Sequence, residues 1–198
     1  MECVGSNVRP TCYVYKAFRN KRVKEILEHN TETLKRAKGV GAIANIISKE
    51  FTRFEAEEAV SPKPWYHYRM HWSGDIFSAE YAQALAIAAA KHPGTTFWIY
   101  TRSFDFVEPI VPIANINTYL SLDPVNRDEG RATLRRLLDR HIVGSDRVRL
   151  GYMSKTQDDV GVTTTPCPCD SGTVKLESAC SRCLMCVKGN KDIWFKTK

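Results

Sequence analysis

Apolar residues recur at helical spacing between Arg22 and Phe54, and the pattern is interrupted near Gly39 and Gly41. The recurring positions are Val23, Ile26, Leu27, Leu34, Val40, Ile43, Ile46, Ile47 and Phe51. We therefore expect two helices in this part of the chain. The sequence Ser61-Pro62-Lys63-Pro64 should stop any helix, because proline lacks a backbone donor and pushes its predecessor toward extended geometry.

Residues 67–101 have the length and order of one βαβ unit. An aromatic-rich strand, Trp65 to Trp72, is followed by an alanine-rich helix from Ala79 to His92 and by a second strand from Thr96 to Thr101. Ser78 is well placed to cap this helix, and Pro93-Gly94 ends it. This order predicts that the two strands are parallel neighbours in one sheet.

The alternation continues toward the carboxyl end. It predicts a short helical segment from Phe106 to Ala114, a strand from Thr118 to Leu122, a helix from Glu129 to His141 and a strand from Val148 to Met153. Strands alternating with helices are typical of α/β folds. Because eight strands cannot be counted, we expect a small parallel sheet or an incomplete (β/α) barrel.

The amino-acid composition changes at Ser154, after which Thr, Gly, Pro and Cys are frequent and apolar residues are few. We expect residues 1–153 to form an α/β domain with an N-terminal helical region. Residues 154–198 should form a Cys-rich, metal-organised segment packed on that domain. The apolar residues Ile193-Trp194-Phe195 are expected to pack back on the body.

Charge and composition narrow the function classes only slightly. The net charge of +7 permits weak, salt-sensitive binding to nucleic acid, but the basic residues are scattered, which favours a merely solvated basic surface and predicts no base-reading element. The first residues lack the basic start and apolar run of a secretory signal, and no stretch approaches the roughly 18 apolar residues of a membrane span. We therefore expect a cytoplasmic protein without a membrane segment.

The cysteines carry the clearest chemical signal. Five of the seven lie late in the chain, as Cys167-Pro168-Cys169 and as a C-x₂-C-x₂-C run at Cys180, Cys183 and Cys186. In a reducing compartment such clusters bind metals more often than they form disulfides. Three closely spaced thiolates suit an iron–sulfur cluster, and a [4Fe–4S] cluster is favoured because its corners are separate iron atoms. A lone zinc ion, which usually takes two separated C-x₂-C pairs, is the alternative cofactor.

The spacing also ranks the ligands. Cys180, Cys183 and Cys186 are forced into one locality, and the loop back to Cys167 is long enough to close around a cluster, so these four are the predicted ligands. Cys169 competes with Cys167. Cys12 and Cys3 would have to be brought to the tail by the tertiary fold, and Cys12 is the better candidate of the two.

Several motifs resemble the phage protein family called gene product 88. They are Cys12-Tyr13, the stretch from His71 to Tyr81, the stretch from Phe97 to Ser103, Cys167-Pro168 and the final C-x₂-C-x₂-C run. The resemblance implies an actinobacteriophage origin, and with it a location in the infected host cell, and a cluster-binding protein whose role is poorly defined. One functional class that follows is a cluster-binding protein that acts on a host or phage macromolecule, whose identity the sequence does not give. In that family the last cysteine is typically followed by Trp, where this chain has Val187.

Enzymatic activity stays open. Polar residues expected at the carboxyl ends of the strands include His71, Ser73, Asp75, Thr101, Arg102, Ser103 and Asp123. Turns, helix caps and an ion pair of Arg102 with Asp75 or Asp123 explain this set better than catalysis. The chain lacks the C-x₃-C-x₂-C spacing of radical S-adenosylmethionine enzymes, so a cluster-dependent enzyme would be only distantly similar to them. A zinc-stabilised nucleic-acid-binding module is the remaining alternative.

Overall fold

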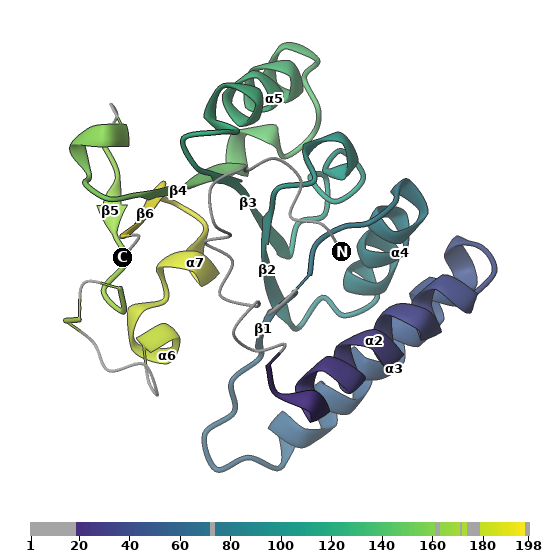
Figure 1. Cartoon of the computed structure of the whole chain (residues 1–198). Helices are drawn as coiled ribbons and strands as arrows, with labels where there is room; N and C mark the ends of the chain where they lie inside the picture. Colours follow the sequence, from purple (N-terminus) through teal and green to yellow (C-terminus); the bar gives the residue numbers. More distant parts are fainter. Residues whose placement is uncertain (1–18, 72–73, 161–162, 171, 174–178, 197–198) are drawn as a thin grey trace.

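A computed structural model of the chain has an all-parallel six-stranded sheet that curls into half of a barrel, with strand order β1-β2-β3-β4-β6-β5 (Figure 1). It describes residues 19–71, 74–160, 163–170, 172–173 and 179–196. The strands are β1 (His67–Arg69), β2 (Thr96–Thr101), β3 (Ile116–Leu122), β4 (Arg149–Ser154), β5 (Thr165–Pro166) and β6 (Ile193–Lys196). The predicted α/β class and the incomplete barrel are confirmed.

The predicted βαβ unit is present as β1, α4 (Ala79–Ala90) and β2, with β1 and β2 parallel. The Ser78 hydroxyl accepts a hydrogen bond from the Tyr81 backbone N–H at 3.1 Å, so the predicted N-cap is confirmed. The first strand is shorter than the predicted stretch from Trp65 to Trp72. It ends at Arg69, and His71 adopts a left-handed backbone with φ of 54° that is incompatible with a continued strand.

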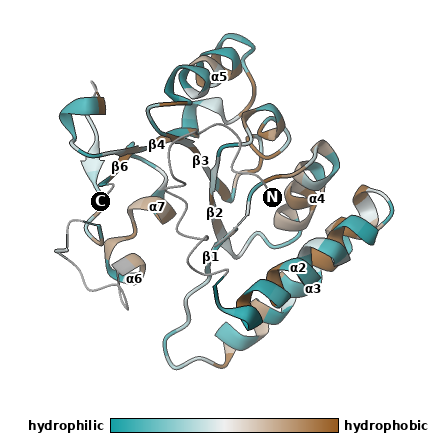
Figure 2. Ribbon diagram, viewed as in Figure 1, coloured by the Kyte–Doolittle hydropathy of each residue, from teal (hydrophilic) through white to brown (hydrophobic). Residues whose placement is uncertain are grey.

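The two N-terminal helices are α2 (Lys21–Arg36) and α3 (Val40–Ala59), separated as predicted at Gly39, whose φ is +83°. Together with α4 and α5 (Arg127–Asp139), they are the longer helices of the described residues. Figure 2 shows α4 coloured mainly as hydrophobic, whereas α2 is largely hydrophilic. No helix in the described ranges combines the length and the apolar character that crossing a membrane requires.

The helical segment expected from Phe106 to Ala114 is not a helix. The structure has a 3₁₀ turn, η1 (Phe104–Phe106), followed by a series of turns. Pro109 and Pro112 explain the difference, because each removes a backbone donor that an α-helix needs. Two further 3₁₀ turns are η2 (Ser145–Arg147) and η3 (Asp158–Val160).

The helices α3, α4 and α5 cover one face of the sheet, which we call the outer face. Alternate strand residues point to it and form two apolar cores, one against α3 and α4 and one against α5. The strand residues of these cores include Phe97, Ile99, Ile116, Leu120, Leu122, Leu150 and Tyr152. The inner face therefore carries the intervening positions, among them Trp98, Tyr100, Asn117, Tyr119 and Gly151.

A buried polar network joins α3 to the end of α4. The buried His92 ring bonds the Ser48 hydroxyl through Nε2 and the Glu55 carboxylate through Nδ1, both at 2.8 Å. The buried Thr95 hydroxyl donates to the same carboxylate at 2.7 Å. Burial alone would raise the pKa of Glu55, but the hydrogen bonds from Thr95 and His92 outweigh it and hold that pKa below 4.5.

Replacing Glu55 with Gln should therefore destabilise the protein by about 1–3 kcal/mol at neutral pH, since two buried donors lose a charged acceptor. A lowered folded-state pKa means that this contribution is present above the unfolded pKa, near 4.5, and is lost as pH falls through the folded value. Urea unfolding across this range should show that the difference between the wild type and the variant shrinks on acidification. The matched control is Glu57→Gln, whose exposed ion pair with Arg53 should contribute little; equal losses in both variants would refute the prediction.

Candidate metal centre

Residues 167–189, which we call the cysteine segment, connect the neighbouring strands β5 and β6. β5 leads directly into Cys167, whose backbone N–H donates to the Trp194 carbonyl at 2.8 Å and extends the β5–β6 pairing. β6 then lies between β4 and β5. Ile193-Trp194-Phe195 does pack back on the body, as predicted, and it does so as an interior strand of the sheet.

Two short helices carry the three closely spaced cysteines. Cys180 and Cys183 lie in α6 (Ala179–Cys183), where a spacing of three puts them on one side of the helix. Leu184 then adopts a left-handed backbone with φ of 57°, which ends α6 and starts α7 (Met185–Lys188) in a new direction. This bend brings Cys186 toward the other two cysteines.

Side chains of the inner face hold α7 in place. The Tyr119 hydroxyl donates to the Met185 carbonyl at 3.2 Å, and the Asn117 amide donates to the Val187 carbonyl. Gly189 ends α7 with a φ of +61° and lies so close to Asn117 that a Cβ atom there would be 2.4 Å from its Oδ1. The cysteine segment therefore covers the face of the sheet opposite to α3, α4 and α5.

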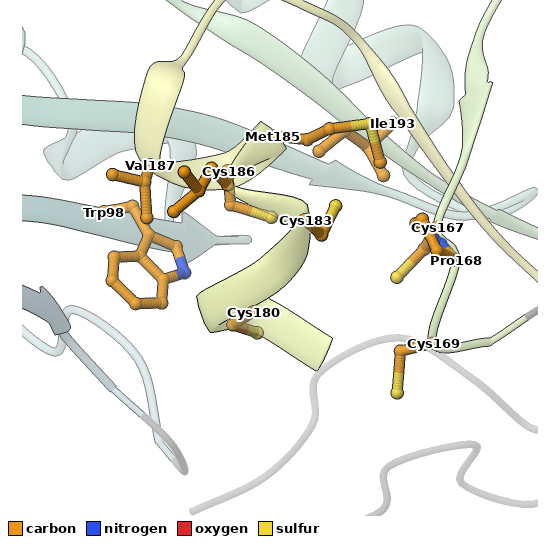
Figure 3. A pocket seen from close by; sticks show the side chains of 11 residues that line it. Trp98, Cys167, Pro168, Cys169, Cys180, Cys183, Met185, Cys186, Val187 and Ile193 are labelled. Carbon is orange, nitrogen blue, oxygen red and sulfur yellow. The ribbon is translucent and has the colours of Figure 1, made fainter. Parts of the chain in front are cut away.

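Five cysteine side chains line one pocket beneath this segment (Figure 3). They are Cys167, Cys169, Cys180, Cys183 and Cys186, and the surrounding walls are largely apolar, with Trp98 from β2 and Ile193 from β6. In Figure 3 Cys167 and Cys186 lie on opposite sides with Cys183 between them in this view, whereas the sulfur of Cys169 points away from Cys167. The structure thus brings all four predicted ligands to one site.

Burial in the pocket opposes ionisation of Cys167, Cys180 and Cys186. Burial, together with the neighbouring cysteines, raises the pKa of Cys186 to about 11, although a hydrogen bond from Tyr100 partly offsets this. Desolvation also raises the pKa of Cys167 and of Cys180. Thiolates crowded in an apolar site repel one another, so several can coexist there only when cations lie among them.

Within the described ranges, no three His, Cys, Asp or Glu side chains converge on a single point as the ligands of one metal ion would. An iron–sulfur cluster requires a different arrangement of ligands from a single metal ion. Each thiolate binds its own iron atom, so the cysteine sulfurs lie further apart than they would around one ion. The alternative ligands Cys3 and Cys12 lie outside the described residues.

Sequence reasoning did not identify Tyr100, whose hydroxyl lies 3.2 Å from the Cys186 sulfur. The alternation of side-chain directions along β2 could have indicated which face Tyr100 occupies. Phe97 and Ile99 are the apolar positions of that strand, so Trp98 and Tyr100 had to face the other side. What the sequence did not reveal is that the cysteine segment covers that side.

The polar residues at the carboxyl ends of the strands form a structural network. Asp75 accepts hydrogen bonds from the Thr101 hydroxyl at 2.5 Å and from the Arg102 backbone N–H at 2.7 Å. The Arg102 side chain pairs with Asp123, as predicted. His71 bonds the Tyr81 hydroxyl at 2.8 Å, which agrees with a packed histidine; Ser73 lies outside the described residues.

Comparison with known proteins gives one family. A family model described as Gene product 88 matches residues 2–189. Two similar relatives are the Gene 88 proteins of Mycobacterium phage L5, 27% identical over 198 residues, and of Mycobacterium phage D29, 27% identical over 199 residues. Each alignment covers 94% of this chain and 77% of the relative. No solved structure gives a significant match.

Proposed function

We propose that this chain, which belongs to the Gene product 88 family of bacteriophage proteins, is a phage iron–sulfur protein that holds one [4Fe–4S] cluster. The proposed ligands are Cys167, Cys180, Cys183 and Cys186. The cluster would serve an interaction with a host or phage macromolecule. Seven cysteines cannot supply the eight thiolates that two four-iron clusters would need, so a single cluster is proposed.

The single observation that supports this function best is the shared pocket of the cysteines. Cys167 comes from the end of β5, Cys180 and Cys183 come from α6, and Cys186 comes from α7, so three separate elements converge. α6 and α7 are too short to be stable helices by themselves. A group that binds all three elements would stabilise the segment, as metals do in small cysteine-rich folds.

The donor set also suits a cluster better than a structural zinc ion. Structural zinc needs four ligands at tetrahedral positions around one centre, with sulfurs about 2.3 Å from the metal. Here the thiols are spread around a pocket with apolar walls, including Trp98 and Val187. Apolar surroundings and limited solvent access are among the factors that set the reduction potential of a cluster.

The test is the metal content of the protein purified without oxygen. We expect about four iron atoms and four acid-labile sulfides per chain, a brown colour and loss of visible absorption on reduction. Trp98 lines the pocket, so its fluorescence should be quenched in the loaded protein and recover after chelation. One zinc per chain with neither iron nor sulfide would overturn the proposal and favour the zinc-stabilised nucleic-acid-binding alternative.

A further inference from the structure

Tyr100 is held rigidly against the proposed ligand Cys186. Its ring stacks on Tyr119 with a centroid distance of 4.7 Å and meets the edge of Phe195 at 5.3 Å. On β4, Gly151 makes room for this ring, because a Cβ atom there would lie 2.7 Å from Tyr100 Cε1. The hydroxyl therefore has a fixed position 3.2 Å from the Cys186 sulfur.

Which of the two groups donates the hydrogen bond depends on whether the Cys186 sulfur is protonated. Between a thiol and a phenol, either group can donate. A cysteine bound to iron has lost its proton, so Tyr100 must then be the donor. A phenol has an ordinary pKa of about 10, so the Tyr100 hydroxyl carries a proton to donate at neutral pH.

Arg69 adds a positive charge on the same side. Its guanidinium carbon lies 5.7 Å from the centre of the Tyr100 ring, over its face. The charge also acts on Cys180, where it partly offsets the effect of desolvation on the thiol pKa. Arg69 is exposed, so its influence passes partly through solvent and should weaken with salt.

We propose that Tyr100 and Arg69 raise the reduction potential of the cluster, with the Tyr100 hydroxyl donating to the Cys186 sulfur. This inference rests on the proposed function. When an external one-electron donor reduces the cluster, negative charge grows on the sulfurs while no covalent bond forms or breaks. A hydrogen bond to sulfur and a nearby cation both favour the more negative, reduced state.

The experiment is a spectroelectrochemical titration of the iron-loaded Tyr100→Phe chain, with dithionite as reductant. We expect the equilibrium constant for one-electron reduction to fall about tenfold, which corresponds to a potential lower by about 59 mV. Tyr119→Phe is the matched control, because it removes a hydroxyl from the adjacent stacked ring that donates to a backbone carbonyl and not to sulfur. Its potential should change much less.

Equal potentials for wild type and Tyr100→Phe, both with full iron content, would overturn this inference and leave the proposed function intact. Loss of iron from Tyr100→Phe alone would also overturn it, because the hydroxyl would then retain the cluster and not tune it. Arg69→Gln gives a second measurement if both tyrosine variants fold poorly. Its potential should fall at low salt and approach the wild-type value at high salt; a shift independent of salt would contradict the role of Arg69. Absence of iron from the wild type would instead reject the proposed function.

Discussion

Replacing Cys186 with Ser should weaken binding of the proposed cluster by more than about 10–100-fold and so sharply lower the iron content of the chain, and Cys180→Ser and Cys183→Ser should do the same. Outer-sphere changes at metal sites already cost about 10–100-fold in affinity, and loss of a ligand removes a bond to the metal itself. Serine is a poor substitute for the thiolate, because its hydroxyl is far less acidic than a thiol and oxygen is a harder donor than sulfur. Iron and sulfide analysis, with visible spectra, measures the effect.

Cys169→Ser is the matched control for these variants. Cys169 lines the same pocket, but its sulfur points away from Cys167, so the variant should keep full iron content and an unchanged spectrum. Far-ultraviolet circular dichroism should confirm that each variant keeps its secondary structure. Full iron content in all three of the first variants would reject the ligand assignment. Full content in Cys167→Ser alone would direct the same test to Cys12.

Gly189→Ala should be the most destabilising single-methyl change in the cysteine segment, at about 2–5 kcal/mol. The φ of +61° costs an L-residue about 1–2 kcal/mol, and the added methyl would lie 2.4 Å from Asn117 Oδ1. Overpacking of this kind typically costs a further ~1–3 kcal/mol. Moving Asn117 away would break its bond to the Val187 carbonyl, so α7 should detach and iron occupancy should fall.

Gly39→Ala is the comparison variant, because it changes a glycine of positive φ without adding a steric clash. Gly39 has a φ of +83° and a ψ of 160°, a backbone conformation that essentially only glycine adopts, and no atom lies within 4 Å of the place that a Cβ would take. Only a backbone cost of about 1–3 kcal/mol should therefore appear in denaturant unfolding. A double variant, Gly189→Ala with Asn117→Ser, should recover part of the lost stability because it shortens the clashing side chain. Equal losses at Gly39 and Gly189, without any such recovery, would show that Asn117 does not confine this position.

Local sequence signals predicted much of the outer half of the fold. The alanine-rich run with Ser78 at its start defined α4, the glycine at position 39 separated α2 from α3, and alternating apolar residues defined β2 and β3. These features depend on residues close together in the chain. The same holds for Cys180, Cys183 and Cys186, whose short spacing requires them to be neighbours.

Long-range strand pairing could not be predicted from such local signals. The apolar residues Ile193-Trp194-Phe195 predict a segment that packs on the rest of the protein. Three residues do not specify that this segment forms a strand between β4 and β5. The roles of Tyr100 and Asn117 depend on that pairing, since it carries the cysteine segment across the inner face. The division at residue 153 stays a prediction, although the later residues complete the sheet.

The position of β6 also affects how the protein can fold. β1 to β4 pair in chain order, whereas Gly151 must wait for Ile193, which arrives only after the cysteine segment has closed a long loop. The entropy of loop closure is lost before such a contact is gained, so we expect β6 to join the sheet after β1 to β4 have paired. Until then one edge of β4 has unpaired backbone groups that can pair with another chain. A group that tied Cys167 to Cys186 would shorten this loop, and we expect it to reduce the time for which that edge of β4 is unpaired.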